Sequence, residues 1–209
     1  MPKLRVHNVT VTLDGFTAGP HQRLEEPFGD GVEGLHDWMV AAMRDRADGK
    51  SGIDVDFIER SEENVGATIM GRNMFGPQRG PWQDASWTGW WGDNPPYHHD
   101  VFVHTHHVRP SIPKDGGTTF HFTDEPLETV LRRAHEAADG RDVRLGGGAA
   151  TIQQYLRAGL VDELHLVIVP LLAGSGERLL DNVADGVAGY RVTELVSSPA
   201  ATHAVLTRR

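Results

Sequence analysis

The chain begins with alternating apolar and polar residues and later changes to helical spacing. Between Leu4 and Leu13 apolar side chains recur at about every second position, which predicts a β-strand that Asp14-Gly15 ends. Residues 14–33 are rich in Gly, Pro and charge and are expected to form a long loop. Apolar residues then recur at helical spacing up to Gly49, which predicts an amphipathic helix with one buried stripe. The stripe consists of Leu35, Trp38, Met39, Ala42 and Met43.

The rest of the chain alternates short apolar runs with helical patterns. Together with the first strand, these runs make about eight strands. Alternating strands and helices favour an α/β fold with a mostly parallel mixed sheet and helices on both faces. The last two strands are close in sequence, so we expect an antiparallel C-terminal hairpin. Helices are predicted at 54–64, 127–138 and 149–158, and strands at 67–70, 101–103, 118–122, 143–145, 163–169, 190–195 and 203–207.

Length and composition limit the possible functions. The 209 residues show neither an internal repeat nor a linker, so residues 1–209 are expected to form a single domain. Lysine and arginine number 20 against 29 acidic residues, and the net charge of -9 argues against nucleic acid and anionic membranes as partners. Cysteine is absent, which excludes disulfides, thiolate catalysis and cysteine-ligated metals. No signal peptide or membrane-spanning run is recognisable, so a cytoplasmic location is expected.

The segment 143–152 carries the clearest chemical signal. A short apolar run ends in Gly146-Gly147-Gly148 and passes directly into a helical pattern. A strand, a glycine turn and a helix N-terminus together expose backbone N–H groups to an anion, and glycine lets a phosphate approach without a Cβ in the way. The same glycines also suit a tight turn that binds nothing. The segment alone therefore leaves a phosphate cradle and a structural turn as equal alternatives.

A proline- and glycine-rich segment at 76–99 contains four of the five tryptophans. Long segments without regular structure are usually functional or disordered, and disordered chains are poor in tryptophan. We therefore expect this segment to be packed, either in the core or in a subunit contact, with a substrate lid as the alternative. The four residues are Trp82, Trp87, Trp90 and Trp91.

Several motifs follow one another in a specific order. They are residues 8–16 (NVTVTLDGF), 68–75 (TIMGRNMF), 101–105 (VFVHT), 145–148 (LGGG) and 161–179 (VDELHLVIVPLLAGSGERL). In this order they resemble the dihydrofolate reductase superfamily over nearly the whole chain. The closer resemblance is to the branch that contains the reductase domain of the bifunctional riboflavin-biosynthesis deaminase–reductase. The zinc deaminase domain is excluded, because its cysteine ligands do not occur in this sequence.

The resemblance implies a dihydrofolate reductase-like three-layer fold, NADPH as the hydride donor and a homodimeric assembly. A phosphate also requires a cationic, hydroxyl-bearing pocket, and Arg72 with Thr105 supplies one. The implied cofactor-binding residues are Gly71, Arg72, His104 and Thr105 at the adenosine 2′-phosphate end, Gly146, Gly147, Gly148, Ala149 and Thr151 at the pyrophosphate, and Thr10, Thr17 and Ala18 near the nicotinamide. Asn73, Val103 and Leu145 are also expected to bind the cofactor.

Two positions depart from the dihydrofolate reductase pattern. Met74 stands where a threonine often gives a hydroxyl to the cofactor phosphates, and Ala149 stands where a basic residue often lies. Both differences weaken the expected phosphate site and leave the preference for NADPH over NADH open. The pyrophosphate cradle must then depend on backbone N–H groups and the helix N-terminus.

The proton donor is the least determined part of the expected site. In dihydrofolate reductase a carboxylate on the first helix binds the pterin, and Asp37 is the nearest candidate here, with Asp30 as the alternative. A carboxylate at the edge of the apolar stripe would have a raised pKa and could relay a proton. The helix dipole alone also explains an aspartate in a first turn. Glu177-Arg178, after the strongest strand, is expected to border the substrate pocket.

Other chemistries fit less well. Six histidines lie between residues 98 and 121, but no carboxylate pattern accompanies them, so no metal site is predicted. The glycine turn lacks the Gly-x-Gly-x-x-Gly spacing of a Rossmann dehydrogenase. The leading hypothesis is an NADPH-dependent reductase of a ribosylamino-pyrimidine or related heterocycle. A dihydrofolate or pterin reductase and a non-catalytic nucleotide-binding protein are the alternatives.

Overall fold

Most strands begin close to where the sequence pattern predicts them. In the computed structural model, which describes residues 2–76, 80–183 and 187–209, they are β1 (Leu4–Thr12), β2 (Phe16–Ala18), β3 (Val65–Gly71), β4 (Asp100–His104), β5 (Ile112–Pro113), β6 (Thr119–Thr123), β7 (Asp142–Leu145), β8 (Glu163–Val169), β9 (Glu177–Arg178), β10 (Tyr190–Ser197) and β11 (Thr202–Arg208). Nine of these strands form one sheet in the order β10-β11-β8-β1-β7-β3-β4-β6-β5. The five pairs from β8 across to β6 are parallel, and the other three are antiparallel. A separate ribbon pairs β2 with β9.

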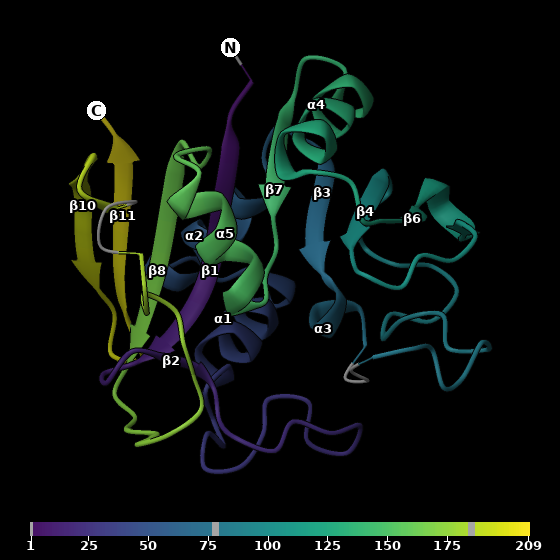
Figure 1. The fold of residues 1–209 in the computed structure, drawn as a ribbon. Coiled ribbons are helices and arrows are strands. Elements are labelled where there is room, and N and C mark those ends of the chain that lie inside the picture. The colour runs from purple at the N-terminus through teal and green to yellow at the C-terminus, as the bar shows by residue number, and fades with distance from the viewer. Residues whose placement is uncertain (1, 77–79, 184–186) are drawn as a thin grey trace.

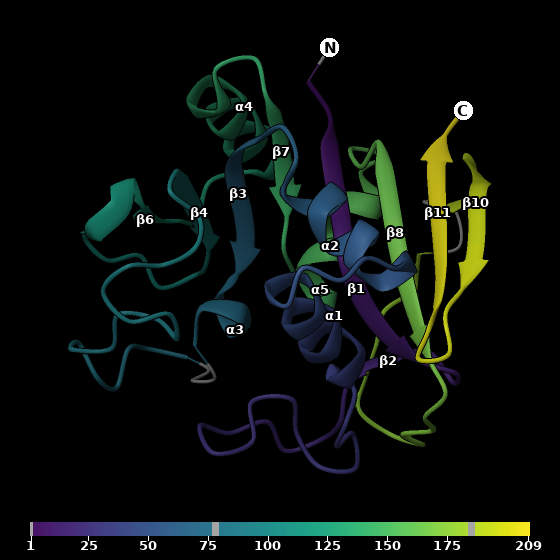
Figure 2. The same cartoon turned by 180° about the vertical axis from the view of Figure 1, so that it is seen from behind.

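Helices lie on both faces of this sheet (Figure 1). They are α1 (Asp37–Ala47), α2 (Ile53–Glu62), α3 (Arg72–Phe75), α4 (Leu127–Ala138) and α5 (Ala149–Arg157), with a 3₁₀ turn at Asp115–Gly117. α4 and α5 cover one face, and α1 and α2 cover the other, which Figure 2 shows from behind. This is the three-layer α/β fold expected from the sequence, including the antiparallel C-terminal hairpin of β10 and β11.

Apolar side chains are buried on each face of the sheet. The larger cluster lies between the sheet and the α4–α5 layer and includes the fully buried Ile69 and Tyr155. A second cluster lies beneath α1 and α2 and includes Trp38 and Ile58. Burying one large apolar side chain contributes on the order of 2 kcal/mol. These two clusters therefore hold the three layers together.

Three details differ from the sequence expectations. The sheet has nine strands rather than about eight, because β5 is only two residues long and too short to show a period. β2 lies within the stretch that was expected to be a loop. Met43 is 49% exposed rather than buried. The buried stripe runs through Trp38 and Ala42, and the next residue points about 100° further round the helix toward solvent.

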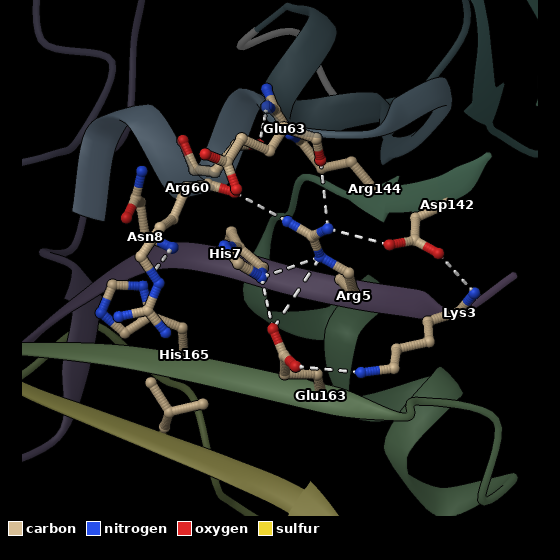
Figure 3. Close-up of polar contacts among 12 residues, drawn as sticks. Lys3, Arg5, His7, Asn8, Arg60, Glu63, Asp142, Arg144, Glu163 and His165 are labelled. Atoms are coloured by element: carbon tan, nitrogen blue, oxygen red, sulfur yellow. Dashed lines mark hydrogen bonds and ion pairs between the residues drawn. The ribbon is translucent and has the colours of Figure 1, made fainter. Parts of the chain in front are cut away.

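A polar network joins the amino ends of β1, β7 and β8 to α2 (Figure 3). Arg5 donates to Asp142 Oδ2 at 2.8 Å and to the carbonyl of Arg60, near the end of α2, at 2.8 Å. Glu163 Oε1 lies 2.8 Å from His7 Nε2, and this hydrogen bond lowers the pKa of Glu163 to about 2. Buried charges are tolerated only when they are paired and hydrogen-bonded, and the charges of this network are. The network therefore holds the strand ends and α2 together.

Candidate functional site

A cleft of about 340 Å³ opens at the carboxyl ends of β3 and β4, beside the first turns of α5. Ligands of open α/β sheets bind at this edge. Seven of the predicted cofactor residues line the cleft, namely Gly71, Arg72, Asn73, His104, Thr105, Gly148 and Thr151. The other lining residues are Gly80, His106, His107, Ala150, Gln154 and Glu177. The structure therefore places residues predicted to bind the adenosine 2′-phosphate and residues predicted to bind the pyrophosphate in one wall of the cleft.

The two glycine turns of the sequence meet in this wall. Gly71 ends β3, and its N–H donates to Gly147 O at 2.5 Å. A Cβ at Gly71 would lie 2.2 Å from Thr151 Oγ1, so a larger residue does not fit without a shift. Gly147 has a φ of +129°, a conformation that L side chains rarely adopt. Glycine is therefore required here by the close approach of the turns, which also leaves the start of α5 open to the cleft.

The first turn of α5 presents backbone donors. Its N-cap is Gly148, whose carbonyl accepts hydrogen bonds from the N–H groups of Thr151 and Ile152 at 3.0 and 3.1 Å. The N–H groups of Ala149 and Ala150 donate to no partner within the described part of the chain. Unpaired N–H groups and the positive end of the helix dipole both favour an anion. This geometry is compatible with the backbone cradle expected from the sequence, and phosphate binding there stays a prediction.

Arg72 places a cation beside this cradle. Its guanidinium carbon lies 3.3 Å from the centroid of the Trp82 ring, and its Nη1 donates to Gly80 O at 3.0 Å. Its Nε and Nη2 atoms are buried and have no partner among residues 2–76, 80–183 and 187–209. Burial and the nearby charge of Arg109 lower the pKa of Arg72, but a guanidinium still stays protonated at neutral pH. Two unused donors on a cation suit an anionic ligand.

β4 delivers a histidine and a threonine to the same wall. His104 Nε2 donates to Glu125 O at 2.9 Å, and burial lowers the pKa of His104, which keeps the ring mostly neutral at pH 7. The hydroxyl of Thr105 accepts the N–H of His107 at 3.1 Å. Because a hydroxyl both accepts and donates, its proton remains available to a ligand. Thr105 is thus a neutral donor close to the Arg72 cation.

The remaining predicted cofactor residues lie behind or beside the cleft lining. The hydroxyl of Thr10 is buried and accepts the N–H of Trp38 at 3.0 Å. Thr17 donates to the carbonyl of Glu177, a lining residue, at 3.1 Å, and Ala18 is buried in the same β2–β9 ribbon. The structure therefore leaves the expected nicotinamide-side residues outside this wall. The rest of the predicted cofactor residues are neighbours in sequence of the lining residues on β4, on β7 or at the start of α5. They are Val103, Leu145, Gly146, Gly147 and Ala149.

Neither candidate proton-relay carboxylate lines the cleft. Asp37 is exposed at the first residue of α1. Asp30 is exposed in the preceding loop, where Arg23 donates to it at 2.6 Å and His21 contacts it at 3.0 Å. The hydrogen bond from Arg23 lowers the pKa of Asp30, which is the opposite of what a proton relay needs. The role of Asp37 stays a prediction.

The tryptophan-rich segment is packed, as its composition predicts. Trp82, Trp87 and Trp91 are half-buried against the aromatic side chains of α3 and β6. Trp87 Nε1 donates to Phe75 O at 3.1 Å, and the ring of Trp90 packs edge-on against Trp87. The part of this segment at 77–79 lies outside the described residues. The segment forms a third apolar cluster at the β4–β6 end of the sheet.

Sequence reasoning missed several residues of the cleft. The stack of Trp82 on Arg72 depends on the path of an irregular segment, for which the sequence carries no periodic signal. His106 and His107 follow the end of β4 and were considered only as metal ligands. Gln154 lies three residues after Thr151, so helical spacing on α5 was the available signal for it.

The described residues offer neither a metal-binding cluster nor a membrane-spanning helix. Within the described ranges, no group of three or more histidine, cysteine or acidic side chains is arranged to hold a metal ion. Two of the clustered histidines instead make single hydrogen bonds, His98 with Gly116 O and His99 with Thr68 Oγ1. Across the same ranges, no helix combines the length and apolarity needed to cross a bilayer.

The sequence was then compared with known families. The family model of the RibD C-terminal domain matches residues 2–198. The chain belongs to the RibD C-terminal domain family. No curated protein sequence matches it. Family membership confirms the resemblance that was drawn from the order of the motifs.

Solved structures share the fold of this RibD C-terminal domain. A putative riboflavin biosynthesis protein from Shewanella sp. PV-4 matches with a TM-score of 0.64 and 20% identity over 99% of both chains. A pyrimidine reductase-like protein from Corynebacterium diphtheriae matches with a TM-score of 0.56 and 16% identity, covering 100% of this chain and 92% of the other. Dihydrofolate reductase from Enterococcus faecalis complexed with NADP(H) matches with a TM-score of 0.53 and 12% identity, covering 99% of this chain and 96% of the other. At these identities the matches establish the dihydrofolate reductase-like fold alone.

Proposed function

We propose that this RibD C-terminal domain is an NADPH-dependent reductase of a ribosylamino-pyrimidine or a related heterocycle. The observation that carries the proposal is the cleft at the carboxyl ends of β3 and β4. A cation with unused donors, a glycine turn and a helix N-terminus converge there. An oxidoreductase is also what the family and the reductase names of its structural neighbours support.

The residues of the cleft fit the phosphates of a dinucleotide. Arg72 would hold the 2′-phosphate through its uncompensated guanidinium charge, and the Thr105 hydroxyl would donate a further hydrogen bond. The first-turn N–H groups of α5 would hold the pyrophosphate. The absence of a side chain at Gly71 lets the end of β3 pack closely against Thr151 and the glycine turn. NADPH, when bound, supplies the hydride, and these residues fix its orientation by holding its phosphates.

A pyrimidine is favoured over a pterin as the substrate. By resemblance, a pterin reductase needs a carboxylate on the first helix that faces the substrate. Asp37 is the candidate for that carboxylate, and its side chain is exposed at the first residue of α1 rather than buried at the edge of the apolar stripe. The pyrimidine reductase-like name of the Corynebacterium diphtheriae neighbour points the same way. Dihydrofolate reduction is therefore kept as the control activity in the test.

Calorimetry and absorbance test the proposal in sequence. NADPH and NADH are titrated into the full chain, and tighter binding of NADPH is expected because only NADPH carries the 2′-phosphate. NADPH absorbance is then followed after addition of a ribosylamino-pyrimidine or of dihydrofolate. Faster oxidation with the pyrimidine supports the proposal. Tight NADPH binding without turnover of either substrate would leave a nucleotide-binding protein instead.

The proposal extends to a homodimer, which the resemblance implies for this family. Sedimentation velocity at micromolar concentration measures the mass directly. A dimer is expected, and a stable monomer at that concentration would remove this part of the proposal.

A further inference from the structure

The tryptophan-rich segment reaches the cleft through the indole of Trp82. The guanidinium carbon of Arg72 lies 3.3 Å from the centroid of this ring, and that of Arg109 lies 4.6 Å from it. Trp82 Nε1 donates to the carbonyl of His107, a lining residue, at 2.6 Å. An edge-on contact with Phe75 supports the ring, with centroids 5.9 Å apart. Trp82 is thus held in place by the core and by the wall of the cleft.

The two arginines on this ring lack a counter-ion. No acidic group forms an ion pair with Arg72 or Arg109 within the ranges that the structure describes, and each arginine donates to backbone carbonyls. Asp84 acts on Arg109 only at longer range, because its carboxylate is hydrogen-bonded to Ser86. Arg109 Nη1 is buried without a partner among the described residues, as are two nitrogens of Arg72. Partly buried, unneutralised cations are unfavourable unless a ligand brings negative charge.

We propose that Trp82 is a positioning residue that gives the cleft its preference for a ribose 2′-phosphate over a ribose 2′-hydroxyl. The inference rests on the proposed NADPH function. The indole holds Arg72 against its face while two donors stay unused, and Arg109 adds a second positive charge at the same ring. A phosphate dianion gains from both charges, whereas a neutral hydroxyl gains from neither.

A merely structural tryptophan would behave differently. A side chain that only fills the core changes stability and affects all ligands of the cleft alike. A side chain that orients a charge changes the affinity for the charged ligand alone. Trp90 provides the matched control, because it lies in the same segment and packs edge-on against Trp87, and the structure shows no contact between its ring and an arginine in the described residues.

The test is titration calorimetry of the full chain with adenosine 2′,5′-diphosphate and adenosine 5′-monophosphate, which differ only in the 2′-phosphate. Trp82→Leu should raise the Kd for the 2′-phosphate ligand roughly tenfold, the scale of a desolvated cation–π contact, and change the other Kd less than about twofold. Trp82→Phe keeps an aromatic face and should recover most of the preference. Trp90→Leu should leave the ratio of the two Kd values unchanged. Arg109→Gln should weaken the 2′-phosphate ligand about threefold and reduce its salt dependence.

Two results would overturn the inference, and they are distinguishable. If wild type prefers the 2′-phosphate ligand but Trp82→Leu keeps the same ratio, the preference does not depend on Trp82 and the NADPH proposal survives. If wild type binds the two ligands equally, both proposals fail. Circular dichroism checks folding, and should Trp82→Leu not fold, Arg109→Gln decides, because an unchanged ratio of the two Kd values in that variant overturns the inference.

Discussion

We predict that acid destabilises this fold through the buried imidazole of His165. Its ring is fully buried, and Nδ1 accepts the N–H of Asn8 at 3.2 Å. The neutral ring therefore carries its proton on Nε2, which donates to His203 Nδ1 at 3.0 Å. His203 in turn donates to Asp54 Oδ1 at 2.7 Å. Each group in this chain accepts one hydrogen bond and donates the next. A second proton on His165 would have to sit on Nδ1, where it would face the N–H of Asn8.

The magnitude follows from the difference between the folded and unfolded chains. Burial lowers the pKa of His165 from 6.5 to about 2. The unfolded chain takes up a proton as the pH falls through 6.5, whereas the folded chain does not, so stability is complete above that value and falls below it. From about pH 7.5 to about pH 5, this one group costs about 2 kcal/mol. That loss is a large fraction of the 5–15 kcal/mol (roughly) that stabilises a typical protein.

Urea denaturation at the two pH values measures the effect. His165→Gln removes the titrating group, so the stability gap between wild type and variant should narrow by about 2 kcal/mol at the lower pH. Ile152→Val, on the buried face of α5, is the control and should cost about 1 kcal/mol at both pH values. Equal acid losses in wild type and His165→Gln would refute the reasoning.

Three further substitutions test other parts of the structure. Glu163→Gln should lower the free energy of unfolding by about 2 kcal/mol, because it weakens the hydrogen bond with His7 and removes the second carboxylate beside Arg5, and a urea-measured loss below about 0.5 kcal/mol would contradict this. Gly71→Ala should destabilise by about 2 kcal/mol and weaken NADPH binding, because its Cβ meets Thr151, whereas Gly52→Ala has open space and should be tolerated in both assays. Asp37→Asn should leave the Kd for NADPH within about twofold of wild type, since the side chain is exposed and outside the cleft, and a tenfold change would place it in the site.

Much of the fold was predictable because its signals are local. Helix α4 has the predicted bounds, Leu127–Ala138, since an amphipathic period follows Pro126 and ends before Gly140. Strands of two or three residues were missed, because so short a segment has no measurable period. Met43 was assigned to the wrong face, because two apolar residues in succession do not show which of them continues the stripe.

The candidate site also has parts that were predictable from the sequence and parts that were not. Gly71 and the turn at 146–148 were predictable, because glycine between a strand and a helix marks a place where backbones approach or a ligand binds. The stack of Trp82 on Arg72 was not, since it depends on how an irregular segment folds back over β4 and β6. The position of Asp37 depended on the variable loop before α1, for which the sequence has no register.

The most direct test of the central claim compares wild type with Arg72→Ala in calorimetric titrations of NADPH and NADH. We predict that the substitution raises the Kd for NADPH at least roughly tenfold, because it removes charge-assisted hydrogen bonds to the 2′-phosphate. The Kd for NADH should change less than about twofold. Equal changes for the two cofactors would contradict the placement of the 2′-phosphate beside Arg72.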